Sequence, residues 1–104
     1  MIKKITAAEF DEVLNSPAAV VDFSATWCGP CKMLAPVIEK VSDQMSDKAA
    51  FYNIDVDEAA EIARQYAIMS VPSVLIFRNG EEVGREIGFD PEPIFKASLE
   101  KYFK

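Results

Sequence analysis

Residues 18–32 read AAVVDFSATWCGPCK and contain both of the chain's cysteines, Cys28 and Cys31. Residues 18–25 are almost continuously apolar, which is typical of a strand that is covered on both faces. The cysteines follow this strand and are separated by two residues. A pair with this spacing can form a redox centre, supply half of a metal site or act as a structural clip.

The apolar spacing on either side of this segment predicts further strands and helices. Strands are expected over 2–5, over 49–56, and over 73–77 with a hairpin partner through 83–87 after the turn Asn79-Gly80. Helices are expected after the capping box Thr6–Glu9 until Ser16-Pro17, from Cys31 to about Met45 with a kink at Pro36, through Ile62–Ala67, and from Asp90-Pro91 onward. This order predicts the α/β class, with a mixed sheet, helices on both faces and the cysteine loop at the carboxyl end of a central strand.

The composition of the whole chain restricts its class of function. The 104 residues predict one domain over 1–104, and half of them are hydrophobic, enough for a real core. The net charge of −6 without a basic cluster argues against nucleic-acid or membrane partners, and the absence of histidine excludes mechanisms that need imidazole. No leader or transmembrane run is visible, so we expect a cytoplasmic protein, in which such a cysteine pair is more often catalytic or metal-binding than a structural bridge.

The two cysteines are expected to have different roles. If a helix begins near Cys28, its unpaired amides and its dipole favour the thiolate of that residue, and Lys32 adds positive charge nearby. Residues three apart on a helix can meet the distance limits of a disulfide. Cys28, at the open end, is therefore the predicted nucleophile, and Cys31, one turn deeper and shielded, is the predicted resolving thiol.

Asp22 is an acid in the middle of an apolar strand, where none is expected. Burial should raise its pKa, which suits a group that accepts the proton of Cys31 near neutral pH. The alternative is that Asp22 lies on a solvated edge of the sheet.

Four segments, in this order and over essentially the full length, resemble the thioredoxin family: Val21-Asp22-Phe23, Trp27–Lys32, Val71-Pro72-Ser73 and Phe77–Gly80. The resemblance implies the thioredoxin fold, with a central mixed sheet of about five strands flanked by four helices. It also implies a cis peptide bond before Pro72.

The implied activity is that of a thiol-disulfide oxidoreductase that reduces protein disulfides. Gly29-Pro30 between the cysteines is the version found in reductants of the family. The implied partners are a thioredoxin reductase, which passes on electrons from NADPH or ferredoxin, and disulfide-containing client proteins. No cofactor is expected beyond the redox-active Cys28–Cys31 disulfide, no metal is expected, and we expect a monomer.

The resemblance also implies a docking surface around the nucleophile. In the family, the proline that corresponds to Pro72 packs against the cysteine pair, and the backbone of Val71 would pair with the substrate chain like an added strand. The matching positions are Trp27, Gly29, Pro30, Val71, Pro72, Gly88 and Phe89.

Four positions depart from the common family pattern. Ser24 replaces a frequent Trp, Ser70 replaces a common Gly, and Phe89 replaces a small residue at the docking rim. Phe51 stands where a Lys often lies near the buried acid, so we expect Asp22 to have a higher pKa here than in relatives that keep this Lys.

Two other functions are open to the cysteine pair. It could supply two ligands of a zinc or iron–sulfur site, but two more ligands are missing and such a site would need a dimer. Alternatively, the fold could serve as a docking platform on which the cysteines are incidental. The presence of Asp22 together with both cysteines argues against that second possibility as the main role.

Overall fold

The computed structural model describes residues 1–104 and is built on a five-stranded sheet in the order β1-β3-β2-β4-β5. The strands are β1 (Ile2–Ile5), β2 (Ala18–Ser24), β3 (Ala50–Asp55), β4 (Ser73–Arg78) and β5 (Glu81–Ile87). β1, β3 and β2 pair in parallel, whereas β4 is antiparallel to both β2 and β5. The predicted mixed sheet is therefore confirmed, and β2 is its central strand.

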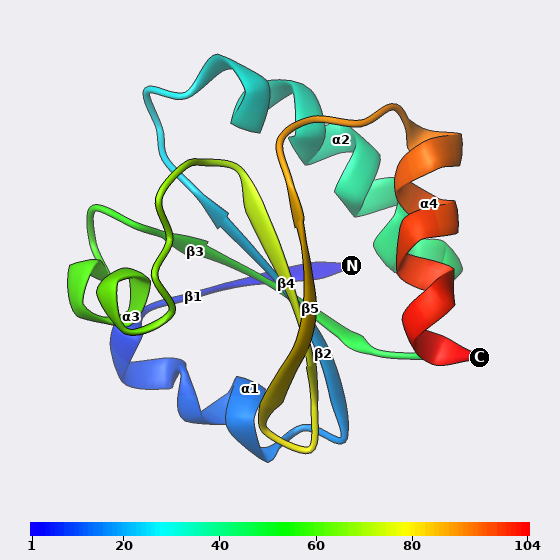
Figure 1. The fold of residues 1–104 in the computed structure, drawn as a ribbon, viewed down its shortest axis with the longest axis horizontal. Helices are drawn as coiled ribbons and strands as arrows, with labels where there is room; N and C mark the ends of the chain where they lie inside the picture. Colours follow the sequence, from blue (N-terminus) through cyan, green and yellow to red (C-terminus); the bar gives the residue numbers. More distant parts are fainter.

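Helices cover both faces of this sheet, as predicted. They are α1 (Asp11–Asn15), α2 (Gly29–Gln44), α3 (Ala60–Gln65) and α4 (Glu92–Glu100), with 3-10 turns over Ala7–Glu9 and Lys101–Phe103. In Figure 1, α1 and α3 lie on one side of the sheet and α2 and α4 on the other. None of these helices has the length and apolar character needed to cross a membrane.

The helices α1, α2 and α3 differ in detail from the prediction. The capping box is present, with the Glu9 carboxylate accepting the Thr6 N–H at 2.9 Å, but it opens a 3-10 turn that precedes a short α1. α2 begins at Gly29, earlier than expected, because Cys28 takes the N-cap position and Pro30 is tolerated in the first helical turn. α2 contains Pro36, as expected, and the kink there stays a prediction. α3 ends at Gln65, so Tyr66 and Ala67 lie outside the helix that was expected to contain them, and Ala67 has a positive φ.

The alternation of β2 divides its side chains between two separate cores. Val21 and Phe23 belong to the cluster on the α1–α3 side, and Val20 belongs to the cluster that contains Leu34 of α2. Asp22 lies on the same face as Val20 and is only 3% exposed. The alternative in which Asp22 occupies a solvated edge is therefore wrong, because β2 is paired on both sides and covered on both faces.

The hairpin between β4 and β5 turns at Asn79-Gly80, where both residues have positive φ. A Cβ at Gly80 would lie 2.9 Å from the backbone oxygen of Leu14, and its φ of +83° disfavours any side chain. We predict that Gly80→Ala lowers the free energy of unfolding by about 1–2 kcal/mol. Urea unfolding measures this change, with the exposed neighbour Glu81→Ala as the control. Equal stabilities of the two variants would show that the turn tolerates a side chain.

Candidate active site

Cys28 and Cys31 lie where the central strand β2 passes into α2. They form a disulfide with a Cα–Cα distance of 5.3 Å. Cys28 is the N-cap of α2, and its Sγ accepts the backbone N–H of Cys31 at 3.1 Å. The sulfur of Cys28 therefore faces an amide at the positive end of the helix dipole, an environment that favours a thiolate after reduction.

Exposure does not distinguish the two cysteines. Cys28 is 4% exposed and Cys31 is 5% exposed, so the expectation that Cys28 is the more open residue is wrong for this disulfide form. Their surroundings do differ. The Cys28 Sγ lies 3.6 Å from the carbonyl oxygen of Val71, whereas Cys31 lines a groove that also contains Asp22.

The segment before β4 closes the site on the Cys28 side. The Val71–Pro72 bond is cis, as the resemblance implied, and Pro72 is buried. The Val71 side chain packs against the cluster formed by Ala25 and the two cysteines. Gly88, with a φ of +87°, donates its N–H to the Pro72 oxygen at 2.8 Å, which joins the end of β5 to the start of β4.

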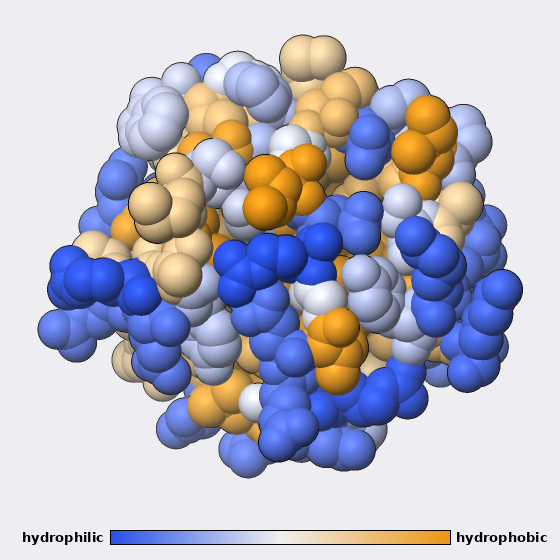
Figure 2. All heavy atoms as spheres, in the orientation of Figure 1, coloured by the Kyte–Doolittle hydropathy of each residue, from blue (hydrophilic) through white to orange (hydrophobic).

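The surface beside Cys28 contains several exposed apolar groups. The Trp27 side chain is exposed and its Nε1 donates to the Asp57 carboxylate at 2.8 Å. Trp27 also lines a hollow of about 200 Å³ together with Val56, Ile68, Met69, Ser70 and Val71. Figure 2 shows that apolar side chains are more frequent in the half of this face that holds the loops around the site.

The remaining predicted site residues differ in how far they are exposed to solvent. Gly29, Pro30 and Lys32 are exposed at the start of α2. Phe89 is partly buried and packs against the core cluster on the α2 side, so its ring is not simply part of an open rim. Sequence reasoning missed this contact because it depends on how the segment after β5 crosses the end of the sheet.

Asp22 is a buried acid without a charged partner. Burial raises its pKa from 3.8 to about 6, and a hydrogen bond from Asn53 opposes this rise. The Asn53 Nδ2 lies 3.2 Å from Asp22 Oδ2, while Oδ1 has no hydrogen-bond partner. Phe51, which pairs with Val20 and packs in the core, offers no cation to this carboxylate.

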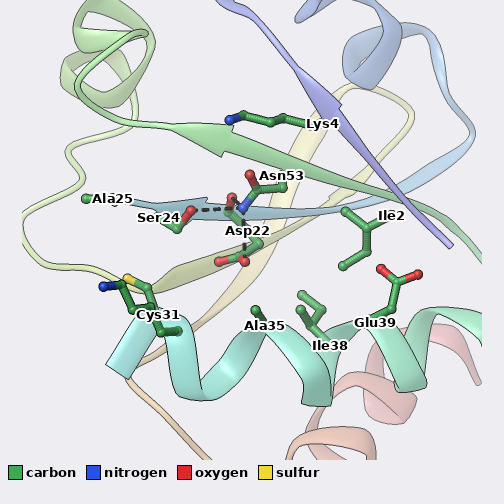
Figure 3. Close-up of a pocket in the computed structure, with 11 residues that line it drawn as sticks. Ile2, Lys4, Asp22, Ser24, Ala25, Cys31, Ala35, Ile38, Glu39 and Asn53 are labelled. Atoms are coloured by element: carbon green, nitrogen blue, oxygen red, sulfur yellow. Dashed lines mark hydrogen bonds between the residues drawn. The ribbon is translucent and has the colours of Figure 1, made fainter. Parts of the chain in front are cut away.

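Asn53 is a site residue that sequence reasoning missed. Its amide nitrogen also lies 2.9 Å from the Ser24 Oγ and 3.3 Å from the backbone oxygen of Asp22. Figure 3 shows the three side chains side by side, with the Asp22 carboxylate directed toward α2. The sequence did contain an indication of this role. Asn53 is a polar residue inside the mainly apolar run 49–56, just as Asp22 is a polar residue inside its own apolar strand.

A cysteine pair at a helix N-terminus, next to a buried acid and a cis-proline segment, defines a thiol-disulfide oxidoreductase on an α/β sheet. Comparison with known proteins shows the family to which the chain belongs. The family model Thioredoxin matches residues 1–101. Thioredoxins of Staphylococcus epidermidis and Staphylococcus aureus are each 42% identical to the chain over 101 residues, which is 97% of this chain and 97% of each relative.

Solved structures agree with these relatives. The structure of a mutant thioredoxin from Halobacterium salinarum NRC-1 has a TM-score of 0.89 and 35% sequence identity, covering 99% of this chain and 91% of that one. The chain therefore belongs to the thioredoxin family. Its activity is dithiol-disulfide exchange with protein disulfides, and its redox group is the Cys28–Cys31 disulfide itself. No cluster of three or more His, Cys, Asp or Glu side chains is placed to hold a metal ion.

The burial of Asp22 predicts a pH-dependent stability. Between its unfolded pKa of 3.8 and its folded pKa of about 6, the folded chain holds a proton that the unfolded chain has lost, so stability falls as pH rises through this range. At pH 8 the ionised carboxylate lowers the free energy of unfolding by up to about 3 kcal/mol. We predict that Asp22→Asn is more stable than the wild type at pH 8 by about 2–3 kcal/mol, and that the difference disappears below pH 4.

Urea unfolding of the oxidised protein at the two pH values measures this difference. The exposed acid Asp47 supplies the control, because Asp47→Asn should change stability by less than about 0.5 kcal/mol at either pH. A gain for Asp22→Asn that is the same at both pH values would show that the charge is not its cause.

Proposed function

We propose that Cys28 is the nucleophile of the exchange reaction and Cys31 the resolving thiol. The thiolate of Cys28 attacks a substrate disulfide, forms a mixed disulfide and releases one substrate thiolate. Cys31 then attacks the Cys28 sulfur, closes the Cys28–Cys31 disulfide and releases the second substrate sulfur, so two electrons pass from the dithiol to the substrate. The observation that supports this order is the N-cap position of Cys28, whose sulfur accepts the Cys31 N–H.

Asp22 is the base that takes the proton of Cys31 in the second step. Both residues line the same groove, whereas the other buried acid, Asp55, accepts the backbone N–H groups of Asp57 and Glu58. Burial raises the Asp22 pKa to about 6, so near neutral pH the carboxylate is ionised but still a stronger base than an ordinary aspartate.

The charge at the start of α2 supports the same chemistry. Lys32 is exposed one residue after Cys31 and adds positive charge there. This charge favours the thiolate form of the pair, in the same direction as the helix dipole.

The protein acts as a reductant of client proteins and is itself reduced by a thioredoxin reductase, which draws on NADPH or ferredoxin. The residues Gly29-Pro30 between the cysteines support this direction, since they match the reductants of the family. We place this function in a reducing compartment, the cytoplasm, where a dithiol persists. Residues 1–104 act as a single domain, because one sheet includes strands from β1 to β5 and the C-terminal helix α4 packs against it through Phe95 and Leu99.

Clients dock beside Cys28. The backbone of Val71 pairs with an extended segment of the client, and the Trp27 hollow receives a neighbouring apolar side chain. Three observations support this surface: the exposure of Trp27, the hollow between Trp27 and Val71, and the short distance from Cys28 to Val71. The rest of the proposed docking surface is formed by the backbone of Gly29, Pro30, Pro72 and Gly88. Phe89 contributes only the part of its ring that is not packed in the core.

The two cysteine roles are tested with single substitutions. We predict that Cys31→Ser accumulates a mixed disulfide with client proteins, because the attacking thiol remains and the resolving thiol is gone. Cys28→Ser should trap no client. Non-reducing electrophoresis after incubation with a disulfide-bonded protein detects these adducts, and NADPH-coupled turnover with a thioredoxin reductase should fall to background in both variants.

The reverse pattern, with adducts only in Cys28→Ser, would exchange the two roles. A wild-type protein that shows no turnover with any reductase and binds zinc stoichiometrically would instead support the metal-binding alternative.

If clients dock in the hollow, a substitution of Trp27 should affect the reduction of a large protein substrate more than that of a small disulfide. Trp27→Ala should raise the KM for a protein disulfide by about tenfold, because an exposed aromatic in a docking site contributes on the order of 1–2 kcal/mol. Reduction of a small dialkyl disulfide should change less than about twofold, since it does not reach the hollow. The matched control is Met33→Ala, an exposed apolar residue on α2 that does not line the hollow. Equal losses with both substrates would place Trp27 in the chemistry instead of the docking surface.

A further inference from the structure

The two oxygens of the Asp22 carboxylate are in different environments. Oδ2 receives the Asn53 amide at 3.2 Å, whereas Oδ1 is buried and has no partner. The carboxylate is directed toward α2, into a groove of about 330 Å³ that Asp22 lines together with Cys31 and Ala35 (Figure 3). The two oxygens are therefore not equivalent as proton acceptors.

The orientation of the Asn53 amide is determined by its surroundings. Its nitrogen lies within 3.3 Å of the Asp22 backbone oxygen, the Asp22 Oδ2 and the Ser24 Oγ. The carbonyl and the carboxylate can only accept hydrogen bonds, so the amide must present its N–H groups to them. The Ser24 hydroxyl accepts the shortest of these bonds, at 2.9 Å, and so holds the amide in this orientation.

This arrangement decides where a proton can bind. A proton on Oδ2 would meet the N–H group of Asn53, which is itself a donor, and would break that hydrogen bond. A proton on Oδ1 keeps it, because Oδ2 can still accept. Oδ1 is thus the atom that can gain a proton at the least cost.

We propose that Asn53 is a positioning residue, held by Ser24, that makes Oδ1 of Asp22 the atom that accepts the Cys31 proton. This inference rests on the proposed role of Asp22 as the base of the resolving step. In that step the S–H bond of Cys31 breaks, the proton goes to Oδ1, and the thiolate attacks the Cys28 sulfur. The bond from Cys28 to the substrate breaks, and the leaving sulfur takes the electron pair. The proton on Oδ1 is afterwards released to solvent through the groove.

The interaction also explains how this chain functions with Phe51 and Ser24 at two positions that depart from the family pattern. Phe51 packs in the core and provides no charge to the acid. Ser24 instead provides a small polar group that the Asn53 amide can reach, and Asn53 in turn donates to Asp22. A neutral hydrogen bond therefore opposes the rise in the Asp22 pKa.

Other charged or titratable groups lie around Asp22, but none of them forms a hydrogen bond or an ion pair with its carboxylate. Along the sheet, Asn53 pairs with Lys4 on β1, and Asp22 pairs with Val74, which in turn pairs with Glu86 on β5. The charged or titratable side chains that share the groove or this row are Lys4, Cys31, Lys32, Glu39 and Glu86. Substitutions at Asn53 and Ser24 leave all of them in place, so a change in pH dependence reports on the amide itself.

The test separates the two thiol steps in one experiment. Reduced protein is mixed with one equivalent of a nitroaromatic disulfide, whose thiolate is coloured. The attack by Cys28 releases the first thiolate, and the attack by Cys31 on the mixed disulfide releases the second. The rate of the second phase is recorded against pH in the wild type and in Asn53→Ala, Ser24→Ala, Asp22→Asn and the control Tyr52→Phe. Tyr52 lies on the same strand as Asn53 but packs in the opposite core.

We expect the midpoint of the second phase to lie near pH 6 in the wild type, where Asp22 titrates. In Asn53→Ala the midpoint should rise by about one pH unit, and the rate below the midpoint should fall about tenfold, because the donor that stabilises the carboxylate is lost. Ser24→Ala should shift the midpoint in the same direction by less. The first phase should be unchanged in both variants, and Tyr52→Phe should match the wild type in both phases.

Two results would overturn the inference in different ways. If Asp22→Asn abolishes the pH dependence of the second phase while Asn53→Ala and Ser24→Ala keep the wild-type midpoint, Asp22 is the base but Asn53 does not position it. If Asp22→Asn leaves the second phase unchanged, the proposed role of Asp22 fails and this inference fails with it. Should Asn53→Ala not fold, Ser24→Ala alone decides, since Ser24 is only partly buried at the end of β2 and its hydroxyl bonds only Asn53.

Discussion

The central position of β2 is the constraint on which the rest of this structure depends. β2 is hydrogen-bonded to β3 on one side and to β4 on the other, and helices cover both of its faces. Its other central side chains are therefore fully buried, and Asp22, which is only 3% exposed, meets solvent only through the groove that it shares with Cys31. An acid in such a strand is held in a low-dielectric environment. The chain leaves β2 at the carboxyl end of the strand, where α/β sheets usually place their sites, and α2 begins at Gly29.

The burial of Asp22 is unfavourable for stability, and the role of base proposed for this residue gives the burial a chemical use. An ionised Asp22 destabilises the folded chain at neutral pH, and its only direct partner is a neutral amide. The apolar clusters on both faces of the sheet offset this cost. Native proteins commonly accept such a local conflict where activity requires it, because a fully solvated acid would be a weaker base for a buried thiol.

The two sides of the cysteine pair are built from different parts of the chain. On one side, Cys28 contacts Val71 in the segment before β4, and Val71 also lines the apolar hollow. On the other side, Cys31 faces the polar groups of β2 and β3. In the proposed mechanism this division separates substrate contact from proton transfer, although both cysteines are almost equally buried in the disulfide form.

The sequence by itself determined the local elements and the chemistry of the pair. Strands, helices and the Asn79-Gly80 turn follow from short-range apolar spacing and from backbone preferences. A charge inside an apolar run made Asp22 a candidate buried acid, and only the pairing of β2 on both sides excluded a solvated edge. Tertiary structure alone decided which groups meet. Asn53 contacts Asp22 because the parallel register of β2 and β3 places them opposite each other across 31 residues of sequence. Such contacts depend on strand register and on where loops cross the sheet, and no local pattern records either.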